Sequence, residues 1–144
     1  MAIRLFSIIF SVSLITVTLV LPANAVQSIL DGVYSDKQAE RGREIFNAYC
    51  SGCHGNKLQG GGDFFPSLSG STFTANWRGQ SLGDIFYFIT EFMPFDMPGA
   101  LEAQEYADAL AYILKYNSYP AGDKELLPDR ELLKKIRFVS ISRD

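Results

Sequence analysis

The chain has 144 residues, of which 47% are hydrophobic and 20% are charged, and its formal net charge is −3 at pH 7. This length suits one globular domain. The slight acidity argues against a nucleic-acid partner, because binding to phosphates needs a basic face. The sequence contains 2 cysteines and 1 histidine, and all of them lie between residues 50 and 54.

The N-terminal segment has the layout of a signal peptide. Arg4 precedes an apolar run over residues 5–21, and Ala23-Asn24-Ala25 fits a cleavage site of small residues. We therefore predict a signal peptide over residues 1–25, export of the chain and a mature protein that begins near Val26. The alternative is an uncleaved membrane anchor, although the apolar run is at the short limit for crossing a bilayer.

The spacing of apolar residues predicts a first helix that begins at Ser35 and runs into Cys50. Ser35 and Gln38 have the spacing of a reciprocal capping box. Spacings of three and four then define an apolar stripe of Ala39, Gly42, Ile45, Phe46 and Tyr49. Because glycine is a poor helix former, we expect Gly42 to allow a second helix to approach closely.

The segment Cys50-Ser51-Gly52-Cys53-His54 is the attachment signature of c-type haem. Two thiols at this spacing can form thioethers with the vinyl groups on one porphyrin edge, and the histidine that follows can bind the iron. Three other interpretations are weaker. A thioredoxin-type pair needs a strand-helix-strand unit, a zinc site needs about four ligands, and a disulfide here would close a very small loop.

The segment from Gly55 to Gln80 is rich in Gly, Ser, Asn and Pro, which predicts one long loop. A loop of this length in a small domain usually wraps something. A large flat cofactor would give a surface to the apolar residues inside the loop, which are Phe64, Phe65, Leu68, Phe73 and Trp77.

Two further helices and a tail complete the predicted elements. Ser81 begins a helix with Asp84 as its capping-box partner, and Pro94 ends it. A third helix is predicted from about Ala103 to Tyr116. The tail is predicted to hold one short helix over residues 129–136 and a strand over residues 138–141, for which the sequence indicates no partner.

With the one histidine used, a second iron ligand has to come from another residue type, and methionine stabilises ferrous iron. Met93 and Met97 are the two methionines of the mature chain. Each precedes a proline, so the dipeptides do not separate them. An open sixth position, as in a haem sensor, is a further alternative.

The run from Phe46 to Gly55 resembles the haem-binding segment of class I bacterial cytochromes c, and the resemblance extends over residues 31–122. It implies an all-α fold, with three main helices and long loops around one covalent haem c. Gly42 and Phe46 would cross a last helix at Ala111-Tyr112.

The resemblance also implies roles for single residues. The Pro66 carbonyl would hydrogen-bond the proximal His54, which orients the ring and raises its basicity. Met93, rather than Met97, would be the distal ligand. Trp77 would donate its indole N–H to a haem propionate, and the alternative is a half-buried indole bonded to backbone.

Short segments narrow the resemblance to small cytochromes found with, or fused to, quinoprotein (PQQ) dehydrogenases. These segments are Asp31-Gly32-Val33-Tyr34, Met93-Pro94, Pro98-Gly99, residues 104–108 and Tyr119-Pro120-Ala121-Gly122. The resemblance implies redox partner proteins, with a quinoprotein dehydrogenase as donor and a terminal oxidase or another cytochrome as acceptor.

We therefore expect an exported, periplasmic electron carrier and not an enzyme, because no set of catalytic acid, base and nucleophile is visible. Residues 26–122 would form the cytochrome domain and residues 123–144 a C-terminal extension. The haem-binding residues would be Cys50, Cys53, His54, Met93, Pro66 and Trp77, with His54 and Met93 on the iron. The alternative from another class is a cytochrome subunit of a quinoprotein dehydrogenase.

Overall fold

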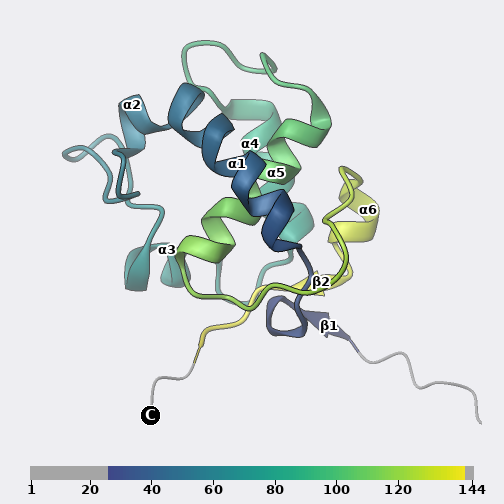
Figure 1. Ribbon diagram of the computed structural model, residues 1–144. Coiled ribbons are helices and arrows are strands. Elements are labelled where there is room, and N and C mark those ends of the chain that lie inside the picture. Colours follow the sequence, from purple (N-terminus) through teal and green to yellow (C-terminus); the bar gives the residue numbers. More distant parts are fainter. Residues whose placement is uncertain (1–25, 142–144) are drawn as a thin grey trace, which may run out of the picture.

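The computed structural model describes residues 26–141, which are mostly helical (Figure 1). The elements are β1 (Gln27–Ser28), the 3-10 helix η1 (Ile29–Asp31), α1 (Asp36–Tyr49), α2 (Ser51–His54), α3 (Gly70–Trp77), α4 (Leu82–Phe92), α5 (Ala103–Tyr116), α6 (Arg130–Leu133) and β2 (Ile136–Arg137). The three longest helices are those that the sequence predicts, and the all-α class is confirmed. The predicted signal peptide lies outside the described residues.

The crossing of α1 over α5 is the centre of the fold. A Cβ built on Gly42 would fall on the backbone carbonyl of Asp108, so only glycine allows this approach. One turn further along α1, the ring of Phe46 packs at 5.3 Å from that of Tyr112. The predicted close approach at Gly42 and the crossing at Tyr112 are therefore both confirmed.

Capping differs between the two helices for which the sequence predicts a capping box. At α4 the box is reciprocal, because Ser81 Oγ accepts from the Asp84 N–H (3.2 Å) and Asp84 accepts from the Ser81 N–H (2.9 Å). At α1 only half of it forms, with Ser35 Oγ accepting from the Gln38 N–H at 3.1 Å. The prediction of a full box at Ser35 was wrong.

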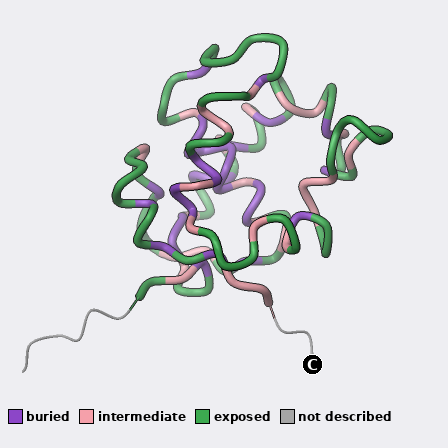
Figure 2. Tube along the Cα trace, turned by 180° about the vertical axis from the view of Figure 1, so that it is seen from behind, coloured by how far each residue is buried: buried purple, intermediate pink, exposed green. Residues whose placement is uncertain are grey.

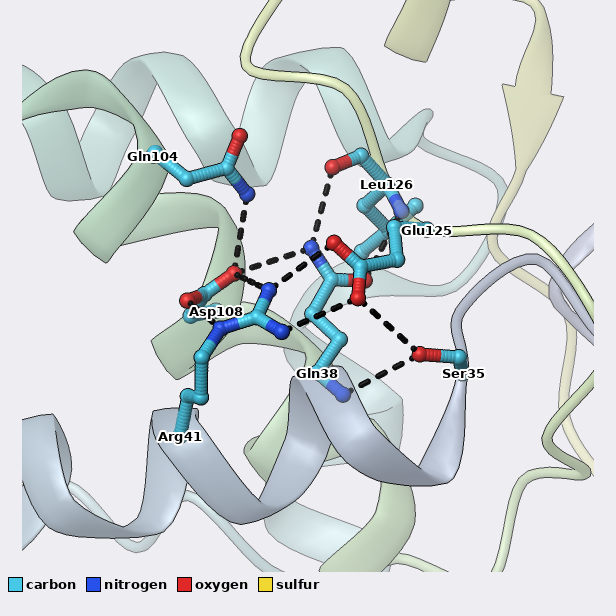
Figure 3. A network of polar contacts seen from close by, with 7 residues as sticks. All are labelled: Ser35, Gln38, Arg41, Gln104, Asp108, Glu125 and Leu126. Atoms are coloured by element: carbon cyan, nitrogen blue, oxygen red, sulfur yellow. Dashed lines mark hydrogen bonds and ion pairs between the residues drawn. The ribbon is translucent and has the colours of Figure 1, made fainter.

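The Gln38 side chain lies in the core instead, where it joins α1 to the tail (Figure 3). Its amide oxygen accepts from the Leu126 N–H at 2.8 Å, and its amide nitrogen donates to the Leu126 carbonyl at 3.0 Å. These two bonds satisfy a stretch of tail backbone that has no strand or helix partner of its own. The capping-box spacing is the same at Ser35 and at Ser81, so the sequence could not show that the Gln38 side chain bonds the tail instead.

Residues 70–77 form α3, so the prediction of one uninterrupted loop from Gly55 to Gln80 was wrong. The physical reason is the burial of Phe73, whose ring meets that of Phe138 edge-on at 5.5 Å. Phe73 and Trp77 are four residues apart and therefore share one face of a helix. This short apolar repeat is hidden by the surrounding Gly, Ser and Asn residues.

The tail is part of the same packed body. The helix α6 is shorter than predicted, and the strand lies at Ile136–Arg137 rather than at residues 138–141. It pairs in parallel with β1, which precedes the first helix. Phe138 is fully buried, and its N–H donates at 2.8 Å to the carbonyl of Gln80, which belongs to no strand. The partner strand lies more than a hundred residues away in sequence, so local patterns could not identify it.

Buried residues are concentrated on the crossing helices, and the long connections between them are exposed (Figure 2). In Figure 1 the loop from α2 to α3 lies at the left of the helices, and the loop from α4 to α5 lies above them. Within residues 26–141 there is no helix with the length and apolar character needed to cross a membrane.

Candidate haem-binding site

The two cysteines lie one helical turn apart at the junction of α1 and α2. Cys50 closes α1, with its N–H donating to the Phe46 carbonyl at 2.9 Å. The N–H groups of Cys53 and His54 both donate to the Cys50 carbonyl, at 3.2 and 2.9 Å. One turn of hydrogen-bonded backbone therefore fixes the spacing of two thiols and one imidazole.

Both cysteines carry free thiols in the structure, with Cys50 half-buried and Cys53 exposed. Burial, and to a smaller extent the neighbouring Cys53, raises the pKa of the Cys50 thiol to about 11. This thiol is therefore protonated near neutral pH. Cys53 faces solvent and can be reached by an external reactant.

His54 is held in one orientation by the loop that follows it. Its side chain is buried, and Nδ1 lies 2.9 Å from the Pro66 carbonyl oxygen. Since a carbonyl only accepts, the neutral ring carries its proton on Nδ1 and its lone pair on Nε2. Within residues 26–141, no hydrogen-bond partner occupies Nε2. The contact that the resemblance implies between His54 and Pro66 is thus present in the structure.

A small network positions the Pro66 carbonyl. The Gly60 N–H donates to the His54 carbonyl at 2.8 Å, and the Gly61 N–H donates to the Phe65 carbonyl at 3.0 Å. Gly60 has a φ of 81°, which other residues rarely adopt, and a Cβ there would meet the Phe65 carbonyl. The glycine-rich loop is therefore folded back tightly on His54.

The structure separates the two candidate methionines. Met93 is half-buried and closes α4, with its N–H donating to the Ile89 carbonyl at 3.1 Å. Its own carbonyl accepts from the Tyr106 hydroxyl of α5 at 2.7 Å. Met97 lies further along the connecting loop, and its side chain is 53% exposed. Two helices therefore fix the backbone of Met93, while Met97 lies on the surface.

Trp77 ends α3 and is half-buried. Its ring meets that of Phe88 edge-on at 5.8 Å, and Phe88 in turn packs on Phe92. No acceptor for its indole N–H is found among residues 26–141, so the alternative of a backbone-bonded indole is not observed. The N–H remains available to a ligand.

Sequence reasoning missed two residues that hold this region in place. Tyr106 lies within the predicted third helix, and its hydroxyl fixes the Met93 backbone. A tyrosine on the apolar face of a predicted helix could have indicated this bond, because a buried hydroxyl usually has a hydrogen-bond partner. Asn117 bonds the backbone on both sides of Ser69. Its amide nitrogen donates to the Leu68 carbonyl at 2.9 Å, and its amide oxygen accepts from the Gly70 N–H at 2.8 Å.

The chemistry of the donor set fits a covalent haem. It offers two unpaired thiols one turn apart, an oriented imidazole with a free Nε2, and a thioether whose backbone is fixed. The described residues contain no group of three or more His, Cys, Asp or Glu side chains placed to hold a metal ion. Cys50, Cys53, His54 and Met93 are therefore the residues that would hold the haem and its iron.

Comparisons with known proteins identify the family of the chain. Residues 37–113 match the family model described as cytochrome C oxidase, cbb3-type, subunit III. Among solved structures, the sulfane dehydrogenase SoxCD from Paracoccus pantotrophus is similar, with a TM-score of 0.50 and 19% sequence identity over 88% of this chain and 68% of that chain. At this identity the likeness concerns the fold alone. No curated protein is significantly similar in sequence.

The match to the family model covers more than half of the chain and includes the Cys50–His54 segment, α4 and most of α5. The helical architecture is that of a class I cytochrome c. Such domains transfer electrons through haem and are carriers rather than enzymes. The chain therefore belongs to the family of the cbb3-type cytochrome c oxidase subunit III and is a monohaem c-type cytochrome.

Proposed function

We propose that this cytochrome is exported to the periplasm and carries one covalent haem c, attached through Cys50 and Cys53. The layout of residues 1–25 supports export, and an oxidising compartment is where such a cysteine pair is expected. The haem supplies a one-electron couple between ferric and ferrous iron. The chain supplies attachment, axial ligands and burial.

The observation that carries the proposal is the contact between His54 Nδ1 and the Pro66 carbonyl at 2.9 Å. A backbone acceptor fixes the tautomer and the ring plane, which leaves Nε2 as a ligand to iron. It also makes the ring a stronger donor to the metal. Thiol exchange and disulfide formation need no iron-binding imidazole, so neither accounts for a histidine held in this way directly after the cysteine pair.

Met93 is the proposed distal ligand. Its backbone is fixed by hydrogen bonds to α4 and α5, so its thioether needs little ordering before it binds. A thioether ligand favours ferrous iron and raises the reduction potential. Trp77 is proposed to donate its unpaired indole N–H to a haem propionate.

A dehydrogenase is the proposed electron donor, and a terminal oxidase or another cytochrome is the proposed acceptor. The resemblance of short segments to cytochromes found with quinoprotein dehydrogenases supports the donor. The similar structure is itself named a dehydrogenase, and the family is named for an oxidase. The same observations favour a second candidate, in which the chain is a tightly bound subunit of a dehydrogenase. Co-purification at high salt would identify a subunit, whereas a freely exchanging monomer would identify a shuttle.

The test is an optical spectrum of protein expressed in the periplasm, recorded oxidised and reduced, together with its mass after denaturation. We expect a c-type reduced spectrum and a mass increase of one haem, which Cys50→Ser and Cys53→Ser together abolish. Met93→Ala should remove the weak near-infrared band of sulfur-to-iron ligation and open the iron to carbon monoxide. Met97→Ala is the matched control and should keep the band.

Each other outcome has a definite meaning. Loss of the band in Met97→Ala only would move the distal ligand to Met97. Rapid binding of carbon monoxide by the unmodified reduced protein would indicate an open iron site and a sensor. Absence of covalent haem would contradict the proposal.

A further inference from the structure

The loop between α4 and α5, residues 93–102, presents large apolar side chains to solvent. Phe95 is 78% exposed and Met97 is 53% exposed, and Phe92 at the end of α4 is also exposed. Pro94 and Leu101, by contrast, are buried and anchor the two ends of the loop. Clustered exposed apolar side chains with a polar surround usually mark an interaction site.

The exposure belongs to an ordered backbone. The Met97 N–H donates to the Pro94 carbonyl at 3.0 Å, and the Ala100 N–H donates to the Met97 carbonyl at 3.2 Å. These two successive turns, with the Tyr106 bond to Met93, hold the loop away from the core. Phe95 and Met97 are thus displayed at fixed positions, which lowers the entropy cost of docking.

The charge around the loop is mainly acidic. Residues 79–114 contain 6 acidic side chains and no lysine or arginine. Glu91, Asp96 and Glu102 border the loop and are exposed. Five basic residues lie in the described part of the tail: Lys124, Arg130, Lys134, Lys135 and Arg137. Of these, Arg130 lies over the Tyr87 ring of α4 at 3.9 Å, and the Tyr87 ring is 6.4 Å from that of Phe92.

We propose that Phe92, Phe95 and Met97, bordered by Glu91, Asp96 and Glu102, form the surface that docks a redox partner with an apolar patch rimmed by lysine or arginine. We call these six residues the docking surface. This inference rests on the proposed function, since it places the docking surface beside Met93. The apolar centre supplies contact area, and the acidic border steers the encounter and fixes the orientation.

The acidic border decides which kind of partner can bind the docking surface. A second copy of this chain that docks through the same face would bring acidic borders together, which is repulsive. An anionic membrane surface would be repelled for the same reason. A basic protein is the occupant that gains from both the apolar centre and the border.

The test uses the holoprotein and a defined probe, ferric mitochondrial cytochrome c, a redox protein with a lysine-rich surface. Stopped-flow absorbance measures its reduction at several ionic strengths. Asp96→Asn should slow the reaction about threefold to tenfold at low salt, because a contact charge pair is worth about 1 kcal/mol in water. The difference should shrink as salt screens the pair. Asp123→Asn, with the same charge change on the tail, is the control and should slow it much less.

The apolar centre is tested with Phe95→Ser against Leu127→Ser, which removes an exposed side chain from the tail. Phe95→Ser should slow the reaction about tenfold at every ionic strength, and Leu127→Ser should not. Both variants should keep the wild-type reduction potential, near-infrared band and rate with a small reagent, ferricyanide. An equal loss of rate with ferricyanide would overturn the inference, because Phe95 would then act on the haem.

The remaining outcomes separate this inference from the proposed function. A protein without haem would contradict the proposed function and this inference together. Normal haem with wild-type rates in Asp96→Asn and Phe95→Ser would contradict this inference alone. Self-association in sedimentation that Phe95→Ser abolishes would overturn it too, and would assign the surface to a second copy.

Discussion

At the scale of single residues, buried hydrogen bonds to backbone do most of the positioning. The Pro66 carbonyl orients His54, and the Tyr106 hydroxyl holds the Met93 carbonyl. Each bond connects a proposed ligand to a residue 12 or 13 positions further along the chain. An isolated bond of this kind is worth about 1 kcal/mol net, but losing one partner leaves a buried group unpaired.

Replacing Tyr106 by phenylalanine tests the second of these bonds. Tyr106→Phe should lower the free energy of unfolding by about 1 kcal/mol, because the Met93 carbonyl loses its donor. It should also weaken the near-infrared band, since the Met93 backbone is less fixed. Thermal unfolding and the optical spectrum of the holoprotein measure both effects. Tyr112→Phe is the control, because its hydroxyl has no hydrogen-bond partner within residues 26–141, and equal losses in the two variants would contradict the role of Tyr106.

Asp108 is a buried carboxylate that receives hydrogen bonds from three side chains (Figure 3). Arg41, Gln104 and Gln38 approach its oxygens at 2.8, 2.8 and 3.1 Å. Burial by itself would raise the pKa of Asp108, but these donors outweigh it and lower the pKa below the ordinary value. Arg41 also reaches Glu125 of the tail at 2.9 Å, and the hydrogen bond from Arg41 lowers the pKa of Glu125.

The lowered pKa of Asp108 predicts how stability depends on pH. A carboxyl whose pKa is lower in the folded state stabilises it fully above the unfolded pKa of about 4, and loses this contribution as the pH falls through the folded pKa. Asp108→Asn should therefore lose about 1–3 kcal/mol at pH 7. Thermal unfolding between pH 7 and pH 3 should show the difference from wild type shrinking as the pH falls. A difference that is constant with pH would contradict this account.

At the scale of elements, close packing of helices depends on small residues at the contact. Gly42 brings α1 onto the backbone of α5 at Asp108. Gly83 does the same for α4 and α6, since a Cβ there would meet the Arg130 carbonyl oxygen at 2.7 Å. The second contact joins the tail helix to a helix that ends at Met93. The tail thus supports the element that presents the proposed ligand.

Substitution of Gly42 measures how much the close packing of α1 on α5 contributes to stability. Gly42→Ala should lower the free energy of unfolding by about 1–3 kcal/mol, because α1 and α5 have to move apart. The matched control is Gly52→Ala in α2, where an added Cβ finds open space. Chemical denaturation of the two holoproteins compares them. A stability of Gly42→Ala within about 0.5 kcal/mol of wild type would show that the helices shift without cost.

At the scale of the whole molecule, the C-terminal tail completes the core. Phe138 lies between Phe73 of α3 and Tyr119, with ring centroids 5.5 Å from each. The Tyr119 hydroxyl donates to the Val139 carbonyl at 3.0 Å, and β2 pairs with β1. The tail therefore joins the first strand, α3 and the end of α5, all of which are far apart in sequence.

Truncation of Phe138 tests this closure. Phe138→Ala should cost about 3–5 kcal/mol, as removal of a fully buried phenylalanine does. Leu127→Ala removes a side chain that is 57% exposed and should change stability by less than about 0.5 kcal/mol. Thermal unfolding of both holoproteins gives the comparison. Similar melting temperatures for the two variants would mean that the tail detaches without loss.

Local sequence patterns were enough to predict the haem-attachment motif and the three main helices. The Cys50–His54 motif depends on spacing within one turn, and the helices at Asp36, Leu82 and Ala103 depend on local caps and apolar periodicity. Both are properties of neighbouring residues, so they can be predicted without knowing the fold. The bounds of α5 agree with the prediction for this reason.

Tertiary structure decided the features that depend on distant partners. Gln38, which has the spacing of a capping-box partner, instead bonds the backbone of Leu126 in the tail, because the N–H and carbonyl of that residue need partners in the core. Tertiary structure formed α3 through burial of Phe73 and placed β2 beside a strand at the other end of the chain. It also placed the two methionines in different surroundings, because Met93 closes α4 and is bonded to Tyr106 of α5, whereas the Met97 side chain is exposed.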